Sequence, residues 1–415
     1  MKIIDIQLIK IHPPLAKRYE NKKVQLQGID HRVIARVKTD NGIVGYGDIR
    51  TKANWTPLPQ SFIDRLIDRS PFDFMNNTLM PALGGAMYDV MGKYLGVPAY
   101  KLMGQKVRDG VTVAAWCTQM SARDFAEQVS NAANNGYMVF KMHTADLYDP
   151  FEQAQAAADV APRGFKVHFD FNGSDRSLGT TISVVAELEK KHPIVGFIED
   201  PLSLTALGDW VTLRQRTTIP LIMHVSRLGG MQEAMMGAAD IFMLGDGHPD
   251  YSVGDVLARG TAYSRANIQT VMQFTGGTLT KALALHMAAV LPSATGHSIN
   301  LDDQYEDDVT TKRIPVMEGF SPVPEGPGLG FDVDEAKLAK FAAAKPIPMP
   351  RHVTVVHLPG GRKVYNAYHR PTMRQIAGRE EGTVRGIDYT IWEDDGTAEF
   401  KRVYEKLRTV GRFIE

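Results

Sequence analysis

Charged, imidazole and amide side chains follow several short apolar segments in the central part of the chain. Lys141 and His143 are two residues apart, so alternation along a strand places them on the same face. His168, Asp170 and Asn172 share a face of the following segment in the same way. Ammonium and imidazole groups transfer protons, whereas carboxylate and amide oxygens bind hard cations. The first group therefore suits acid–base chemistry, and the second suits a metal site.

A second carboxylate, Glu199, ends the apolar segment that comes after the one holding Asp170. Two buried carboxylates on neighbouring strands repel strongly in a low dielectric unless a cation or a shared proton lies between them. Mg²⁺ takes oxygen ligands and keeps waters that a substrate carboxylate can replace. Asp170 and Glu199 therefore predict a site for Mg²⁺ or another divalent metal. His224 and Asp246 end two further segments of the same kind.

Each of these residues also has an ordinary structural interpretation. An aspartate at a strand end often caps the following helix, as Asp170 would. Lys141 alone is compatible with a solvated side chain, and His143 alone with a hydrogen-bonded loop residue. His168 is better interpreted as a core or supporting histidine than as a base. The combination of residues, and no single member of it, indicates a functional site.

The elements that position these residues are short β-rich segments that alternate with amphipathic helical stretches from residue 111 onward. Their starts are 20 to 29 residues apart, which suits one strand and one helix each. Eight such units predict an α/β fold with a closed (β/α)8 barrel, and no Gly-x-Gly-x-x-Gly opens a helix as in many doubly wound sheets. In such a barrel, catalytic groups lie at the carboxyl ends of the strands. The expected strands are Val111–Ala115, Val139–Met142, Lys166–Asp170, Val195–Ile198, Leu221–His224, Ile241–Leu244, Ile268–Gln273 and His297–Leu301.

Four regions are expected along the 415 residues. Residues 1–110 form a small α+β domain with strands at 3–11, 33–39 and 43–47 and helical periodicity at 60–104. Residues 111–321 form the barrel, and residues 322–345 combine a turn-rich linker with a helix at 333–344. Residues 346–415 are a C-terminal extension with two strands and an amphipathic helix at 398–407.

Composition excludes several classes of protein. Lys plus Arg and Asp plus Glu both number 47, so no overall field attracts nucleic acid or an anionic membrane. Cys117 is the only cysteine and permits no intramolecular disulfide. No apolar run reaches the roughly 18 residues that span a bilayer, and the first residues lack the apolar core of a signal peptide. We expect a cytoplasmic protein without nucleic-acid or membrane partners.

Several motifs in order along residues 1–345 resemble the enolase superfamily, in particular its mandelate racemase and muconate lactonizing branch. They imply a TIM-like barrel in which residues 1–110 are the capping domain and residues 322–345 return to that cap. The extension after residue 346 has no counterpart in the family pattern. The motifs are TDNGIVGYG (39–47), AMYDVMGK (86–93), GVPAYKLMG (96–104), FIEDP (197–201) and PEGPGLG (324–330).

The resemblance implies that a metal-bound carboxylate substrate loses its α-proton to a base, and that Mg²⁺ stabilises the enediolate. Asp170 and Glu199 then correspond to the first two metal ligands. Lys141 and His143 correspond to the Lys-x-Lys element, with His143 in place of the proton-transferring lysine. An imidazole is neutral and basic at pH 7 without a large shift of its pKa. His143 is therefore the expected base, and Lys141 is an electrostatic aid that steadies the substrate carboxylate.

Three positions depart from the family pattern. The third metal ligand is expected as a carboxylate but falls on His224, which favours transition metals over Mg²⁺, or is absent. Asp246 matches the aspartate of an Asp–His dyad whose histidine is replaced by Gln273. A glutamate that contacts substrate is replaced by Asn300. We expect Asn172, Gln273 and Asn300 to bind substrate, and the broken dyad leaves one base, which argues against two-base racemisation.

These residues predict a divalent-metal-dependent lyase that dehydrates a small hydroxy-acid or sugar-acid carboxylate. Two alternatives stay open at this point. One is a racemase, epimerase or cycloisomerase of the same superfamily. The other is a non-catalytic acid-binding protein that lost a metal ligand and the dyad. The substrate is expected to be a small carboxylate, and the chain is expected to form a homo-oligomer.

Overall fold

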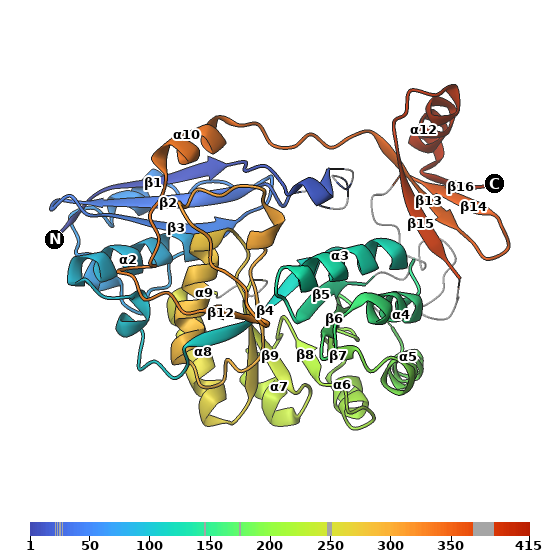
Figure 1. Cartoon of the computed structure of the whole chain (residues 1–415), viewed down its shortest axis with the longest axis horizontal. Helices are drawn as coiled ribbons and strands as arrows, with labels where there is room; N and C mark the ends of the chain where they lie inside the picture. Colours follow the sequence, from blue (N-terminus) through green and yellow to red (C-terminus); the bar gives the residue numbers. More distant parts are fainter. Residues whose placement is uncertain are drawn as a thin grey trace.

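The barrel consists of eight parallel strands that close on themselves (Figure 1). The computed structural model describes residues 1–20, 22, 24, 26, 28–144, 147–173, 176–246, 251–367 and 386–415. Closure comes from the last strand, where Ser298 and Ile299 pair with Val113 and Ala114 of the first. The predicted (β/α)8 barrel is confirmed. Its strands are β4 (Gly110–Cys117), β5 (Val139–His143), β6 (Lys166–Asp170), β7 (Val195–Glu199), β8 (Leu221–Met223), β9 (Ile241–Gly245), β10 (Gln269–Gln273) and β11 (Ser298–Ile299).

Helices cover the outside of the barrel because the strands bury apolar residues on both faces. Several helices begin with a capping side chain. The hydroxyl of Ser121 accepts a bond from Asp124 N, and the carboxylate of Asp149 accepts bonds from Phe151 N and Glu152 N. The helices are α3 (Ala122–Asn134), α4 (Pro150–Val160), α5 (Leu178–Lys191), α6 (Leu207–Arg214), α7 (Met231–Met236), α8 (Val253–Arg265) and α9 (Thr278–Val290).

The N-terminal region is an antiparallel sheet of β1 (Ile3–Ile11), β2 (Arg32–Thr39) and β3 (Val44–Arg50), packed on helix α2 (Pro81–Leu95). Glycine permits this close packing, since a Cβ at Gly47 would lie 1.9 Å from the carbonyl oxygen of Ala82. The short helix α1 (Gln60–Asp64) precedes α2. After the barrel, β12 (Phe320–Pro322) pairs antiparallel with β4, and α10 (Glu335–Ala343) lies on β1 (Figure 1).

The C-terminal extension is a separate antiparallel sheet with one helix, α12 (Ala398–Val410). The sequence predicted two strands here, and the described residues form four. The additional ones were missed because strands of three or four residues are too short to show an alternating pattern. The four strands, in their order across the sheet, are β15 (Asp388–Glu393), β13 (His352–His357), β14 (Lys363–Asn366) and β16 (Arg412–Ile414).

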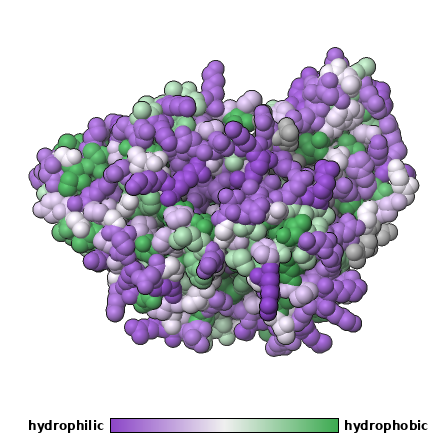
Figure 2. Space-filling model, viewed as in Figure 1, coloured by the Kyte–Doolittle hydropathy of each residue, from purple (hydrophilic) through white to green (hydrophobic). Residues whose placement is uncertain are grey.

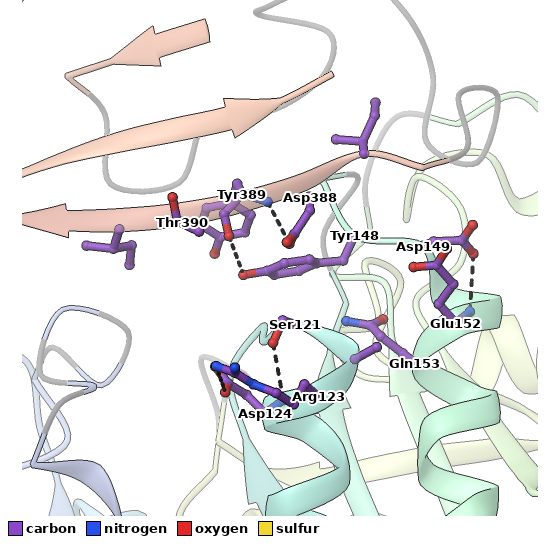
Figure 3. Close-up of a pocket in the computed structure, with 13 residues that line it drawn as sticks. Ser121, Arg123, Asp124, Tyr148, Asp149, Glu152, Gln153, Asp388, Tyr389 and Thr390 are labelled. Carbon is purple, nitrogen blue, oxygen red and sulfur yellow. Dashed lines mark hydrogen bonds and ion pairs between the residues drawn. The ribbon is translucent and has the colours of Figure 1, made fainter. Parts of the chain in front are cut away.

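The extension meets the barrel beside the start of α4. The Tyr148 hydroxyl donates to the carbonyl oxygen of Tyr389 at 3.2 Å, and the two rings are 4.5 Å apart between centroids (Figure 3). A cavity of about 580 Å³ lies beside this contact, between the starts of α3 and α4 and strand β15. None of the described residues that line it belongs to the predicted site.

The molecular surface in this view is mainly hydrophilic, with scattered apolar residues (Figure 2). Within the described ranges, no helix combines the length and apolarity needed to cross a membrane. The boundaries at residues 110, 321 and 345 stay predictions.

Candidate active site

The carboxyl ends of the barrel strands bring the predicted polar residues together. In the register of β5, β6 and β7, His143 is paired with Asp170, and Asp170 with Glu199. His224 directly follows β8, and Gln273 ends β10. The sequence placed these residues at strand ends, and barrel closure gathers them at one mouth.

Lys141 lies at the centre of this group with its side chain fully buried. Its Nζ is 2.7 Å from Glu199 Oε2, 3.1 Å from Asp170 Oδ2 and 3.0 Å from Gln273 Oε1. Burial disfavours the ammonium form, but Glu199 and Asp170 outweigh burial and raise the pKa of Lys141 above its ordinary value. Lys141 is therefore a fixed ammonium that holds two carboxylates together, and it is not a base at neutral pH.

Glu199 is buried and surrounded by cationic or imidazole groups. Besides Lys141, His168 Nε2 lies 2.7 Å from Oε2 and His224 Nδ1 lies 3.0 Å from Oε1. Burial opposes ionisation, yet these neighbours hold the pKa of Glu199 well below its ordinary value. Behind it, His168 Nδ1 is 2.9 Å from His297 Nε2, which orients the His168 ring. His168 thus supports Glu199 from the barrel interior, as its interpretation as a supporting histidine predicted.

His143 lies at the rim of the group, with 24% of its side chain exposed. Its Nε2 is 3.2 Å from Asp170 Oδ2, and the ring packs edge-on against Trp116 with centroids 5.1 Å apart. Burial and the nearby Glu199 raise the pKa of Asp170 to about 6. His143 combines exposure with a carboxylate that orients the imidazole.

His224 closes the opposite side of the group. Its Nδ1 contacts Glu199, its Nε2 contacts the carbonyl oxygen of Asp246, and Gln273 Nε2 lies 3.3 Å from the same ring nitrogen. Burial alone would lower the pKa of His224. The neighbouring Glu199 more than offsets this effect and raises the pKa of His224 to about 9. Its backbone N–H donates to Asp200 Oδ1 at 3.0 Å, which fixes the turn after β8.

Among the described residues, the Asp246 carboxylate is bound by Thr275 and not by an imidazole. Its Oδ2 accepts bonds from the backbone N–H of Thr275 at 3.0 Å and from the Thr275 hydroxyl. The Gln273 side chain points instead to Lys141 and His224. The amide at position 273 therefore takes no part in a proton-transfer pair with Asp246.

Residues 124–337 match the family model of enolase C-terminal domain-like proteins. The chain belongs to this family. It is a mandelate racemase/muconate lactonizing enzyme-like member of the enolase superfamily, as the motifs in the sequence predicted.

Among curated relatives, the N-succinyl-L-Arg/Lys racemase of Bacillus cereus is 24% identical over 244 residues, which are 54% of this chain and 65% of the racemase. The aligned part of this chain thus spans slightly less than two thirds of that relative. The crystal structure of the Bacillus cereus racemase superimposes with a TM-score of 0.68 at 20% identity, over 83% of this chain and 99% of the racemase.

A dipeptide epimerase from Cytophaga hutchinsonii, crystallised with Mg and the dipeptide D-Ala-L-Val, has a TM-score of 0.67 at 19% identity. The superposition covers 82% of this chain and 98% of the epimerase. An isomerase from Streptomyces coelicolor A3(2) has a TM-score of 0.63 at 22% identity, over 82% and 97% of the two chains. At these identities, the likeness establishes the superfamily fold.

Three residues at the mouth of the barrel in this enolase-superfamily member could together bind a metal ion. Asp170, Glu199 and His224 each offer a ligand atom, and these atoms lie within 4.8 Å of one another. Two carboxylates and one imidazole suit a divalent cation, and the imidazole, once it has lost its proton, favours Zn²⁺ over Mg²⁺. The Lys141 ammonium contacts the same carboxylates, so a cation must share them with Lys141.

Two of the residues expected to bind substrate have other partners. Asn300 is buried, its Nδ2 donates to the carbonyl oxygen of Phe274, and its Oδ1 accepts from Ser298. These contacts hold the ends of β10 and β11 together, and nothing in them directs the Asn300 amide toward the mouth. Asn172 is exposed, and its Nδ2 donates to the carbonyl oxygen of Asp170. Substrate binding by either residue stays a prediction.

Arg50 is a residue near the site that sequence reasoning did not find. It ends β3 of the cap, and its Nε donates to the Thr275 hydroxyl at 3.1 Å. Burial raises the pKa of Asp246, and the positive charge of Arg50 partly lowers it. No motif surrounds Arg50 in the sequence, because the contact joins residues 225 positions apart.

Proposed function

We propose that this chain is a lyase of the enolase superfamily that dehydrates a small hydroxy-acid or sugar-acid carboxylate through an enediolate. The supporting observation is the one-sided distribution of bases. His143 is partly exposed and oriented by Asp170, whereas Lys141 is held as a buried ammonium. On the other side, the Asp246 carboxylate is bound by Thr275, and no hydrogen bond joins it to an imidazole among the described residues.

In the proposed reaction, the His143 imidazole accepts the α-proton and the electrons of the C–H bond move into the carboxylate to form the enediolate. Collapse of the enediolate breaks the bond between the β-carbon and its hydroxyl oxygen. The protonated His143 returns a proton to the departing hydroxide, which leaves as water. In a substrate whose α-carbon also carries a hydroxyl, the product is an enol that tautomerises to a 2-keto acid, so one residue serves as base and then as acid.

Asp170, Glu199 and His224 would hold the divalent metal of the superfamily, and the bound metal would supply charge stabilisation for the enediolate. Lys141 fixes the two carboxylates, since its ammonium contacts both. His168 and His297 keep Glu199 in place from behind. Arg50, from the cap, supplies positive charge beside Asp246 and Thr275, where the substrate carboxylate or its polar distal groups would meet it.

Metal binding is tested by titrating the EDTA-treated protein with Mn²⁺ in a calorimeter. Removing a residue that only supports a metal ligand typically lowers metal affinity about 10–100-fold. We therefore expect the Asp170→Asn variant, which loses a ligand itself, to bind Mn²⁺ more weakly by at least this factor. Asn172→Ala, two residues away at the exposed rim, is the matched control and should retain the affinity. Equal Mn²⁺ affinity in Asp170→Asn and the unmodified protein would contradict the assignment of Asp170.

The reaction is tested by incubating the metal-loaded protein in D2O with hydroxy acids, sugar acids and N-succinyl amino acids. Dehydration yields a 2-keto acid, which semicarbazide detects by absorbance. A racemase or epimerase instead places deuterium at the α-carbon of recovered substrate. Racemisation is the second candidate because the curated relative from Bacillus cereus is a racemase. Thermal stabilisation by an acid without turnover would support the non-catalytic binding alternative.

Removal of Arg50 is expected to weaken substrate binding. A hydrogen bond to a charged group contributes about 1.5–3 kcal/mol, so Arg50→Ala should raise KM by about 10–100-fold, with a smaller effect on kcat. Arg50→Lys, which keeps the charge, should recover part of the loss. Steady-state kinetics on the substrate found above measure both constants, and an unchanged KM in Arg50→Ala would exclude a contact with substrate.

A further inference from the structure

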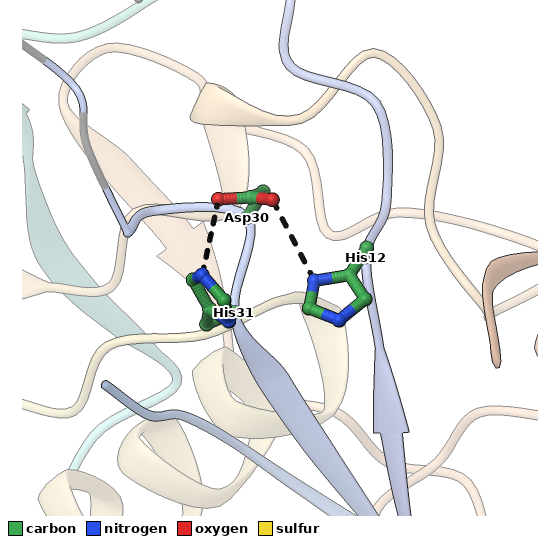
Figure 4. A group of neighbouring side chains, drawn as sticks. All are labelled: His12, Asp30 and His31. Atoms are coloured by element: carbon green, nitrogen blue, oxygen red, sulfur yellow. Dashed lines mark ion pairs between the residues drawn. The ribbon is translucent and has the colours of Figure 1, made fainter. Parts of the chain in front are cut away.

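Two histidines of the cap face one buried aspartate outside the barrel site. His12 follows β1, and Asp30 and His31 directly precede β2. Figure 4 shows each oxygen of the Asp30 carboxylate facing one imidazole ring. His12 Nδ1 is 3.5 Å from Asp30 Oδ2, His31 Nε2 is 4.0 Å from Asp30 Oδ1, and the ring centroids are 4.8 Å apart.

Hydrogen bonding does not account for this arrangement. An N–H···O bond joins atoms about 2.7–3.2 Å apart, and both His–Asp separations are longer. His12 Nδ1 is a buried atom without a hydrogen-bond partner among the described residues. A buried polar atom left in this way costs free energy unless something else binds it. Two ring nitrogens and a carboxylate are therefore close together without short hydrogen bonds between them.

The separations approach those of a metal centre. In a tetrahedral zinc site with ligand bonds of about 2.0–2.2 Å, neighbouring ligand atoms are about 3.3–3.6 Å apart. The distance from His12 to Asp30 has this value, and the ligand atoms of all three residues lie within 4.8 Å of one another. His31 Nε2, at 4.0 Å from Asp30 Oδ1, is farther from the carboxylate than this spacing.

We propose that His12, Asp30 and His31 form a second metal site, which binds Zn²⁺ or a similar transition-metal ion and leaves the fourth position to water. Two imidazoles and one carboxylate select such ions over Mg²⁺ and Ca²⁺, which prefer oxygen ligands. Asp30 is 2% exposed, while the His12 and His31 side chains are 13% and 17% exposed. The carboxylate is therefore held in the interior, and a metal ion could enter from solvent past the two histidines. The site shares no ligand with Asp170, Glu199 and His224.

The site joins three parts of the chain that meet at the cap. Asp30 Oδ2 also accepts a bond from the backbone N–H of Ile347 at 2.8 Å. The His12 backbone N–H donates to the carbonyl oxygen of Phe341 in α10 at 3.0 Å. The segment after α10 runs from the cap to the C-terminal sheet (Figure 1). A bound ion would therefore tie β1 and β2 to the start of the C-terminal extension.

The experiment titrates Zn²⁺ into the full-length, EDTA-treated Asp170→Asn protein, in which metal binding at the barrel site is weakened. We expect one Zn²⁺ per chain and a rise in the thermal midpoint. Adding His12→Ala or His31→Ala should weaken Zn²⁺ binding by at least about 10–100-fold and abolish the rise. His357→Ala, which removes a half-buried histidine of the C-terminal sheet, is the matched control and should change neither.

Folding of each variant is checked by circular dichroism, and His12→Gln replaces His12→Ala if the alanine variant is unfolded. Mn²⁺ titration of His12→Ala in the otherwise unmodified chain should give the unmodified affinity, because the barrel ligands are intact. Zn²⁺ binding that is unchanged in folded His12 and His31 variants would overturn the proposal. This outcome would leave the proposed barrel chemistry unaffected, since the Mn²⁺ titration and the turnover assay test that chemistry separately.

Discussion

Replacement of Lys141 by methionine is expected to destabilise the metal-free protein by about 3–5 kcal/mol, the cost of removing one partner from a buried ion pair. Methionine nearly matches the length of the lysine side chain, so the main change is the loss of the ammonium. Asp170 and Glu199 then face each other without the cation that lies 3.1 and 2.7 Å from them. Urea denaturation of the EDTA-treated protein measures the free energy of unfolding.

The same substitution should make the protein depend on a divalent metal. Two unneutralised carboxylates and His224 would bind Mn²⁺ more tightly once the competing ammonium is gone. Metal at about 100 times its dissociation constant restores about 2.7 kcal/mol, most of the expected loss. Removal of metal with EDTA should reverse this gain.

Lys281→Met provides the matched control. Lys281 is also buried, but among the described residues its ammonium has one carboxylate partner, Asp302, at 3.0 Å. Its replacement should destabilise the protein without creating a cation site, so Mn²⁺ should not restore stability. If Lys141→Met is as stable as the unmodified protein without metal, or if Mn²⁺ stabilises both variants equally, Lys141 does not hold the two carboxylates in the way described.

Replacement of His143 by alanine is expected to lower kcat by about 10²–10⁴-fold, the usual contribution of a positioned base, with little change in KM. His143 is a partly exposed residue at the rim, and Asp170 lies 3.2 Å from its Nε2. Formation of the 2-keto acid and exchange of the α-proton in D2O should be lost together, because both require the same proton abstraction. Stopped assays by NMR measure the two rates on one sample.

Stability and metal affinity provide the control for His143→Ala, since neither depends on the proton-transfer step. Both are expected to stay close to those of the unmodified protein, and added imidazole should restore part of the activity. Turnover that survives in a folded, metal-binding His143→Ala variant would show that another group abstracts the proton.

The central residues of the site were predicted from the sequence because the relevant signals are local. Apolar segments with a strand and a helix per unit locate the barrel, and polar residues at the ends of those segments lie at its mouth. Asp170, Glu199 and His143 are neighbours because their strands are neighbours in the register. This relation follows directly from the order of the strands along the chain.

The role of Lys141 was harder to predict. From the sequence, Lys141 was expected to steady the substrate carboxylate, and its contacts lie instead with Glu199, Asp170 and Gln273. Gln273 is 132 residues away on β10. The order of the strands does not show where a long, flexible side chain lies inside a closed barrel. The position of the Lys141 ammonium depends on the charged groups that are buried near it in the folded protein.

Local pattern thus established the barrel, the cap sheet and the strand-end residues, because hydrophobic periodicity and strand order depend on near neighbours in the chain. Contacts between distant segments depended on the folded chain. These include Arg50 against Thr275, Asp30 between His12 and His31, and Tyr148 against Tyr389. Each of these groups joins segments that are far apart in the sequence, and the spacing of residues does not show which side chains of distant segments will meet.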